Sequence, residues 1–168
     1  MADTQSQDFN PERLRLAASS LRLARVCLAD AFAHAITRET FGKKLIENQI
    51  IRVKFAACGR LIEPAHAFLE QLVYMVSESK AKGLDIQIGG MTALLKIMST
   101  QALEQALRES QQIMGGLGYF KNGKGARIEQ ISRDLRVMVI GGGSEEIMSD
   151  LAIRQEMQYM HTQAKAKL

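Results

Sequence analysis

The sequence predicts an all-α domain, an antiparallel bundle of the four-helix type, and three observations carry that prediction. The 168 residues include no Trp and only two Pro, while Leu, Ala, Ile and nine Met supply most of the apolar side chains. This balance favours packed helices over strands, which are richer in aromatic and β-branched residues. Apolar residues recur at helical spacing through long stretches of the chain. Only short connectors separate these stretches, and long helices with short connectors pack as antiparallel neighbours.

The first helix is predicted over residues 10–37. Asn10 is its expected N-cap, Pro11 suits the first helical position, and Glu12 places an acid in the first turn, at the positive end of the helix dipole. The polar residues 1–9 are expected to form a flexible leader ahead of it.

The second helix is predicted over residues 49–82, after a connector at 38–48 in which Gly42 breaks the apolar pattern. Pro64 lies inside this helix and is expected either to kink it or to mark a boundary, because proline removes a backbone donor. Gly83 is the expected helix end.

The third helix is predicted over residues 85–112. Its pair Gly89 and Gly90 is expected to mark a close backbone approach to a neighbour, since two glycines otherwise only weaken a helix. A glycine-rich loop follows at 115–125.

Two further helices complete the prediction. A short helix is expected at 126–140, three glycines at 141–143 break it, and a last helix covers 144–160 with Ser144 as N-cap. Residues 161–168 are expected to form a tail, so that the bundle domain occupies residues 10–160.

Composition and charge also exclude several classes of function. No run of eighteen apolar residues occurs, which excludes a membrane span, and the polar N-terminus is not a secretory signal. The net charge of +4 is spread along the chain, so no nucleic-acid-binding arm is expected, and a DNA-associated function would need a denser basic patch. Cys27 and Cys58 are expected to be buried apolar residues. His34, His66 and His161 are too scattered for metal ligands, so no metal site is expected.

The first segment that could form a binding site is TRETFGKK. Arg38, Lys43 and Lys44 flank Phe41 and Gly42. One interpretation is a basic helix end that complements the helix dipole. The other is a phosphate site with an aromatic lid.

The second and third segments are glycine-rich. The GGxG within 112–119 suggests either helix termination or a phosphate loop, although no strand precedes it as a dinucleotide fingerprint requires. The glycines of 141–146 feed a helix N-terminus, where unpaired N–H groups suggest either a tight turn or a site for an anion or a carbonyl oxygen.

Taken together, these segments are much more specific. The order ERL…TRETFGKKL…ENQ…QQIMGGLGY…SRDLRV…IGGGSEEIM resembles the C-terminal helical domain of the flavin-dependent acyl-CoA dehydrogenases, from about residue 9 to residue 155. In that family the domain follows an N-terminal helical domain and a central β domain. Neither is present in these 168 residues, so the chain is expected to be a piece of a longer polypeptide and inactive by itself.

The resemblance implies an FAD site that the chain shares with another subunit. Arg38 would contact the FAD pyrophosphate of a neighbouring subunit, and the loop that starts at Gln112 would hold the adenosine and pyrophosphate end. Asn48 stands where relatives commonly have His, which makes its flavin contact less certain. The implied cofactor-binding residues are Arg38, Thr40, Phe41, Leu45, Asn48, Gln49, Gln112, Gly115, Gly116, Ser144 and Glu146.

The resemblance also implies a catalytic base, because the family converts acyl-CoA to trans-2-enoyl-CoA by removing an α-proton and a β-hydride. Most members carry the catalytic Glu at the position that is Gly142 here. A branch that includes the isovaleryl- and long-chain enzymes places it instead in an E-R-L context at the start of the first helix, which points to Glu12. Glu145 is an alternative acid. The implied substrate-binding residues are Asn10, Arg13, Gly142 and Gly143.

The expected parent protein is an FAD-containing oxidoreductase of fatty acid β-oxidation. It would form a homodimer or homotetramer and pass electrons to an electron-transfer flavoprotein or another acceptor. The C-terminal Ala-Lys-Leu is a variant of a peroxisomal address, so the expected location is the peroxisome or the mitochondrion. The alternative is a non-catalytic helical assembly module derived from the family, which the loss of the usual Glu at Gly142 favours.

Overall fold

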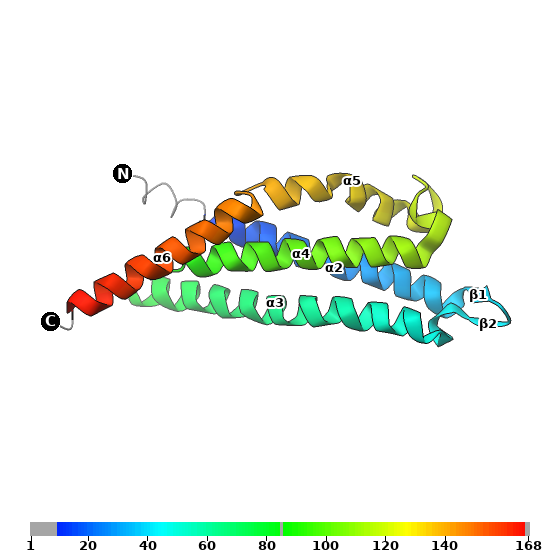
Figure 1. The fold of residues 1–168 in the computed structure, drawn as a ribbon, viewed down its shortest axis with the longest axis horizontal. Coiled ribbons are helices and arrows are strands. Elements are labelled where there is room, and N and C mark those ends of the chain that lie inside the picture. The colour runs from blue at the N-terminus through cyan, green and yellow to red at the C-terminus, as the bar shows by residue number, and fades with distance from the viewer. Residues whose placement is uncertain (1–9, 85, 167–168) are drawn as a thin grey trace.

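The structure is a computed structural model that describes residues 10–84 and 86–166. Three long antiparallel helices lie side by side along its length (Figure 1). The fourth position of the bundle is shared by two shorter helices that follow one another, as Figure 1 shows. The helices are α2 (Asn10–Thr37), α3 (Gln49–Lys82), α4 (Gly89–Met114), α5 (Ala126–Ile140) and α6 (Glu145–Ala166). The all-α prediction is confirmed.

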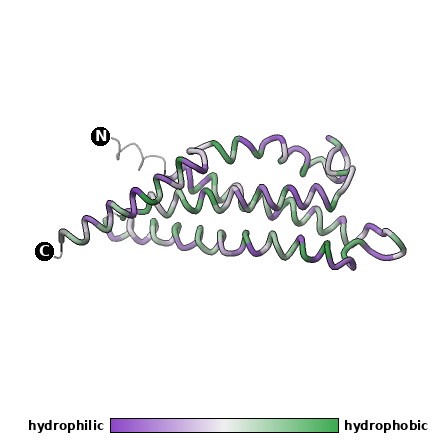
Figure 2. The backbone as a smooth tube through the Cα atoms, in the orientation of Figure 1, coloured by the Kyte–Doolittle hydropathy of each residue, from purple (hydrophilic) through white to green (hydrophobic). Residues whose placement is uncertain are grey.

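Helix α4 lies at the centre of the bundle and has buried residues along its whole length from Gly89 to Met114, because it packs against α2, α3, α5 and α6. Hydrophobic and hydrophilic segments alternate along the long helices in Figure 2, as amphipathic helices require. Each fully buried leucine or isoleucine contributes about 1.5–3 kcal/mol of burial free energy. The main core cluster includes Leu21, Cys27, Cys58, Ile62, Leu103, Leu107 and Ile128.

The two cysteines are free thiols and are fully buried, as expected. Burial raises the pKa of Cys27 to about 12 and that of Cys58 to about 11, because a thiolate is poorly solvated in an apolar core. Both residues therefore act as small apolar residues of the core.

The boundaries of α2, α3 and α5 agree with the sequence prediction, but the role expected for Asn10 is wrong. Asn10 already lies within α2, and its side-chain oxygen accepts a hydrogen bond from Arg13 Nη1 at 3.4 Å. A charged donor one turn along the helix thus engages the side chain that was expected to cap the helix. The leader expected at residues 1–9 lies outside the described residues.

Pro64 does not mark a boundary, since α3 is continuous from Gln49 to Lys82. Pro64 is exposed, so the carbonyl group that it leaves unpaired one turn earlier faces the solvent side of the helix, where water can hydrate it. Gly83 ends α3 in the left-handed conformation at φ +61°, as the sequence predicts.

Helix α4 begins at Gly89, later than the expected residue 85, which itself lies outside the described residues. The Ile88 carbonyl accepts both the N–H of Thr92 at 2.8 Å and its hydroxyl at 2.7 Å, which fixes the start there. The close approach expected at the glycine pair is confirmed. A Cβ on Gly90 would lie 3.1 Å from the Ala152 carbonyl oxygen on α6.

Helix α6 continues to Ala166, past its expected end at residue 160. The added residues His-Thr-Gln-Ala-Lys-Ala contain neither proline nor glycine, so no residue type there stops a helix. In the described part of the chain, no helix combines the length and the apolar character needed to cross a membrane.

Candidate functional site

The residues singled out from the sequence gather at two opposite ends of the bundle (Figure 1). We call the end where α5 meets α6, beside the start of α2, the turn end. It contains Asn10, Glu12, Arg13, Gly142, Gly143, Ser144, Glu145 and Glu146. The hairpin end, where α2 meets α3, contains Arg38, Thr40, Phe41, Leu45, Asn48, Gln49, Gln112, Gly115 and Gly116. The 28 residues of α2 separate the two ends by about 42 Å.

At the turn end, Arg13 joins the first and last predicted segments of the site. Its side chain is buried, and its Nε donates to the Gly142 carbonyl at 3.1 Å across 129 residues of sequence. The same guanidinium donates to Asn10. Burial lowers the pKa of Arg13, and the neighbouring Glu12 carboxylate opposes that shift. The structure therefore brings Asn10, Arg13 and the glycine turn into direct contact.

The backbone at Gly142 explains why glycine stands there. Its φ is +69°, and a Cβ would lie 3.0 Å from Leu16 Cδ1 and 3.5 Å from Arg13 Cγ. A side chain would therefore meet backbone strain and a close contact together. A glutamate cannot occupy this position without a shift of the turn or of Leu16, which favours a base elsewhere.

The N–H groups of the glycine turn are not all used within the chain. Gly141 N–H donates to the Val137 carbonyl at 2.8 Å, and Gly143 N–H donates to the Ile140 carbonyl at 3.2 Å. Among residues 10–84 and 86–166, no acceptor meets the N–H of Gly142. This donor is therefore available to a bound molecule.

The two candidate acids have different surroundings. Glu12 is exposed in the first turn of α2, directly before Arg13. Glu145 instead accepts a hydrogen bond of 2.6 Å from Gln101 Nε2 on α4. The nearby Glu146 is exposed, and its pKa is lowered by its own backbone N–H and by the Ser144 hydroxyl, which stabilise the carboxylate at the start of α6.

The hairpin end is built on a tight turn. Two short antiparallel strands, β1 (Glu39–Thr40) and β2 (Lys43–Lys44), flank Phe41 and Gly42. Both turn residues have positive φ, +50° and +78°, as a two-residue hairpin turn requires. A non-glycine residue rarely adopts this conformation, and here it holds the Phe41 ring fully exposed to solvent.

The rest of the connector holds this hairpin on the bundle. A 3-10 helix, η1 (Leu45–Glu47), follows β2, and Asn48 Nδ2 donates to the Leu45 carbonyl at 3.0 Å. The Asn48 amide therefore already has a partner within the chain. Leu45 packs against a small apolar cluster that contains Ile113, near the end of α4. This cluster brings the TRETFGKK segment and the QQIMGG segment to one end of the molecule.

A groove of about 460 Å³ lies between α4 and α5 and is lined by Gln112 and Gly115, with Arg108, Gln111 and Ser132 beside them. The next residue, Gly116, is exposed, and a Cβ added there would meet nothing within 4 Å. Its φ also lies outside the left-handed region. Nothing in the described chain requires glycine at this position, which fits close approach by a bound molecule.

The hairpin end is electropositive. Burial lowers the pKa of His34, and the positive charges of Arg38 and Lys124 lower it further. Arg127 hydrogen bonds to Asp30 at 2.8 Å, which holds the start of α5 against α2 and places Lys124 near His34. An anionic group is therefore favoured here.

His34 is expected to report binding at this end. In the folded chain its pKa should lie below its ordinary value of 6.5, so protonation of His34 favours unfolding as the pH falls. A bound pyrophosphate would offset the charges of Arg38 and Lys124 and raise that pKa. NMR titration of ¹³C-histidine-labelled protein with and without FAD measures the shift. Lys124→Ala should raise the pKa without any ligand, and a pKa that FAD leaves unchanged would contradict an anion site here.

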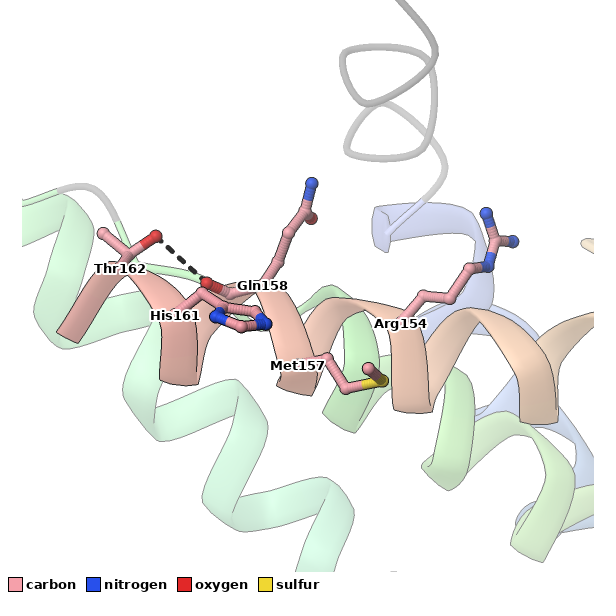
Figure 3. Close-up of a pocket in the computed structure, with 5 residues that line it drawn as sticks. All are labelled: Arg154, Met157, Gln158, His161 and Thr162. Carbon is pink, nitrogen blue, oxygen red and sulfur yellow. Dashed lines mark hydrogen bonds between the residues drawn. The ribbon is translucent and has the colours of Figure 1, made fainter. Parts of the chain in front are cut away.

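A second hollow, of about 360 Å³, lies on the outer surface of α6 (Figure 3). All of its lining residues come from that one helix, and Thr162 donates to the Gln158 carbonyl at 3.0 Å. It contains none of the catalytic, cofactor-binding or substrate-binding residues predicted from the sequence. In the described ranges, no group of three or more His, Cys, Asp or Glu side chains is placed to hold a metal ion.

One residue of the turn end was missed by the sequence analysis. Lys96 on α4 is fully buried and donates to the carbonyl groups of Val139 and Gly143, the latter at 2.7 Å. The signal was its spacing, because Lys96 shares one helix face with Ala93, Thr100 and Leu103, all of them buried.

Comparison with known proteins gives consistent matches. The family model of the acyl-CoA dehydrogenase C-terminal domain matches residues 2–157. The chain is 49% identical over 150 residues to acyl-CoA dehydrogenase AFT10-1 of Alternaria alternata, a match that covers 88% of this chain and 35% of that protein. It is 33% identical over 141 residues to the mitochondrial very long-chain specific acyl-CoA dehydrogenase of Homo sapiens, which covers 83% of this chain and 20% of that protein.

Solved structures show the same likeness. A probable acyl-CoA dehydrogenase from Mycobacterium abscessus superposes with a TM-score of 0.77 at 32% identity, over 89% of this chain and 37% of that one. This chain therefore spans about a third of the Alternaria and Mycobacterium proteins that it resembles.

Proposed function

The chain belongs to the acyl-CoA dehydrogenase family, as its C-terminal domain, and from this premise we propose that it contributes the base, the subunit interface and part of the FAD site to a complete acyl-CoA dehydrogenase. The observation that carries the proposal is the contact between the start of α2 and the glycine turn, where Arg13 Nε donates to the Gly142 carbonyl. This contact joins the first turn of α2, which carries Glu12, to the glycine turn, whose Gly142 N–H has no acceptor in the described chain.

The proposed reaction is α,β-dehydrogenation of an acyl-CoA thioester to the trans-2-enoyl-CoA. Glu12 accepts the α-proton as the general base. FAD, when bound, supplies the acceptor for the β-hydrogen, which leaves as a hydride. The proton and the hydride together account for the two hydrogens lost from the substrate.

The glycine turn is proposed to bind the thioester carbonyl. The negative charge that develops on this oxygen as the α-proton leaves is stabilised by donors that already point at it. The Gly142 N–H is such a donor, because it meets no acceptor in the described part of the chain. Asn10, Arg13 and Gly143 would border the CoA and thioester parts of the substrate.

The hairpin end has features that fit an FAD pyrophosphate. Arg38 is exposed, and both its charge and that of Lys124 act on His34. Arginine pairs with phosphate oxygens through two parallel N–H groups. Gly116 leaves its backbone open to close approach. The groove beside Gln112 would take the adenosine end, and Thr40, Phe41, Leu45, Asn48 and Gln49 would complete this surface.

The separation of the two ends supports a shared cofactor. Ser144 and Glu146 lie at the turn end, about 42 Å along α2 from Arg38. A flavin dinucleotide is much shorter than this span, so one FAD cannot contact both groups in one chain. Both groups touch FAD only when two chains associate, with Arg38 reaching the FAD of its neighbour. A homodimer or homotetramer is therefore proposed.

The proposal also covers the electron acceptor and the cellular location of the complete protein. An electron-transfer flavoprotein or another acceptor would reoxidise the flavin. The human relative, which is mitochondrial, favours the mitochondrion, whereas Ala-Lys-Leu would favour the peroxisome if Leu168 is the natural C-terminus. Ala166 ends α6, and the last two residues lie outside the described part of the chain.

Anaerobic titration of the complete protein with acyl-CoA tests the function. We expect the absorbance of the oxidised flavin to bleach as enoyl-CoA forms, because the β-hydride reduces the bound FAD. A series of straight and branched acyl chains would identify the substrate class.

The alternative, a non-catalytic assembly module, predicts a different result. It rests on one observation, the absence of an acid at Gly142. Such a protein would oligomerise through the bundle, yet no acyl-CoA would bleach its flavin. The open hairpin-end groove and the free Gly142 N–H favour the enzyme, since assembly requires neither.

A further inference from the structure

Lys96 is a fully buried lysine, and its described hydrogen bonds go to carbonyl groups on the two sides of the glycine turn. Its ammonium group donates to the carbonyls of Val139, near the end of α5, and of Gly143, ahead of α6. The Val139 carbonyl lies in the last turn of α5 and so lacks a partner within that helix, and Gly143 lies in the turn between α5 and α6. One side chain from α4 thus ties both sides of the glycine turn to the core.

The setting of Lys96 is unfavourable for a charge. Burial lowers its pKa and the nearby Arg13 lowers it further, while the Glu145 carboxylate opposes both. A buried ammonium costs several kcal/mol of desolvation, and an apolar side chain of similar volume would avoid that cost. A lysine at this position is therefore better explained by what it holds than by packing.

Lys96 and Arg13 donate to consecutive carbonyl groups of the turn from two different helices. Arg13, on α2, binds the carbonyl of Gly142, and Lys96, on α4, binds that of Gly143. The Gly142 N–H belongs to the peptide group just before these two carbonyls, and it has no acceptor in the described chain. Lys96 also holds the Val139 carbonyl, so the two cations restrain the chain on both sides of the Gly141–Gly142 peptide and thereby limit the direction of its N–H.

We propose that Lys96 is a positioning residue that orients the glycine turn toward the substrate through its bonds to Val139 and Gly143. This inference rests on the proposed function, because it assigns the turn to the thioester. Lys96 touches neither substrate nor cofactor in this proposal. It acts through the turn, where preorganised donors give most of their benefit.

The test is Lys96→Met in the complete protein, since methionine fills a similar volume without charge or donors. Thr100→Val is the matched control. Thr100 is buried one turn further along α4, and among the described residues its hydroxyl donates only to carbonyls of its own helix, those of Lys96 and Ile97. Both variants remove a buried polar group, and only the first loosens the turn.

Two readouts separate positioning from stability. Hydrogen exchange of the amides from Gly141 to Met148 should become at least about tenfold faster in Lys96→Met and stay unchanged in Thr100→Val. Per bound FAD, kcat/KM for acyl-CoA should fall at least about tenfold in Lys96→Met alone, because one misaimed donor costs about that much or more. Both variants are expected to have a lower Tm.

The possible outcomes of this test lead to different conclusions about Lys96. A Lys96→Met protein with kcat/KM within about twofold of the wild type would overturn the positioning role. If Lys96→Met does not fold, Lys96→Gln retains a neutral, shorter donor group and is expected to show both effects in the same direction but smaller. If the wild-type protein oxidises no acyl-CoA, the proposed function fails, whereas the exchange measurement still decides whether Lys96 holds the turn.

Discussion

Replacement of Glu12 by Gln in the complete protein is expected to lower kcat for acyl-CoA by about three orders of magnitude while FAD stays bound. The amide keeps the size and polarity of the side chain but cannot accept the α-proton, and a positioned base contributes about 10²–10⁴-fold to such a step. Stopped-flow measurement of flavin reduction checks the prediction. Because Glu12 is exposed at the surface of this domain, the Tm should change little.

The matched control is Glu145→Gln, which neutralises the other candidate acid on the far side of the same turn. Glu145 is held by Gln101 on α4, so its amide variant should retain kcat within a few-fold of the wild type. If Glu145→Gln abolished turnover and Glu12→Gln did not, the assignment of the base would have to move to Glu145.

A rescue experiment tests whether an acid at residue 142 can replace Glu12. Gly142→Glu, introduced beside Glu12→Gln, restores an acid at the family's more common position. Activity is not expected to return, because Gly142 has a φ of +69° and a Cβ there would lie 3.0 Å from Leu16 Cδ1. Recovery of turnover would show that the turn can rearrange, and it would contradict the steric account of the glycine.

Replacement of Arg38 by Ala is expected to weaken FAD binding by about ten- to a hundredfold, the cost of losing one charge-assisted contact of about 1.5–3 kcal/mol. The measurement is the ratio of FAD to protein after gel filtration, followed by titration of the apoprotein with FAD. Arg22→Ala is the control, because Arg22 is also exposed on α2 but lies away from the hairpin end. An Arg38→Ala protein that retains all of its FAD would remove the pyrophosphate role.

Gly116→Ala tests the same surface without a change of charge. A Cβ at Gly116 meets nothing within 4 Å and needs no strained backbone, so the Tm of the variant should equal that of the wild type or exceed it slightly. FAD retention should nevertheless fall, since the methyl group would stand where the cofactor approaches. Equal FAD retention in this variant would place the cofactor away from Gly116.

Local pattern was sufficient for most helix boundaries. Helices α3 and α5 begin and end where apolar spacing and glycine stops predict, because a helix is specified by residues three and four apart and by its own ends. Two expectations failed because they depended on partners, and the end of α6 was predicted too early because no residue type at 161–166 stops a helix. Asn10 binds Arg13 and does not cap α2, and α4 starts at the Ile88 carbonyl and not four residues earlier.

The candidate site was less predictable than the helices. The sequence showed its residue types and motif order, and it showed that a glycine, Gly142, stands where most of the family has the catalytic Glu. Their division between two ends of a bundle about 42 Å apart was not visible, because that follows from the length and direction of α2. The role of Lys96 was hidden for a related reason, since its partners lie 43 and 47 residues further along the chain.

The sequence by itself therefore determined the fold class, the helices and the chemical character of the residues in the site. The tertiary structure alone decided which of them meet. Arg13 and the Gly142 carbonyl are 129 residues apart, and Lys96 reaches the same turn from α4. Helix propensity and amphipathic spacing act over a few residues, whereas these contacts exist only once the packing of α2, α4 and α5 has brought distant backbone and charge together.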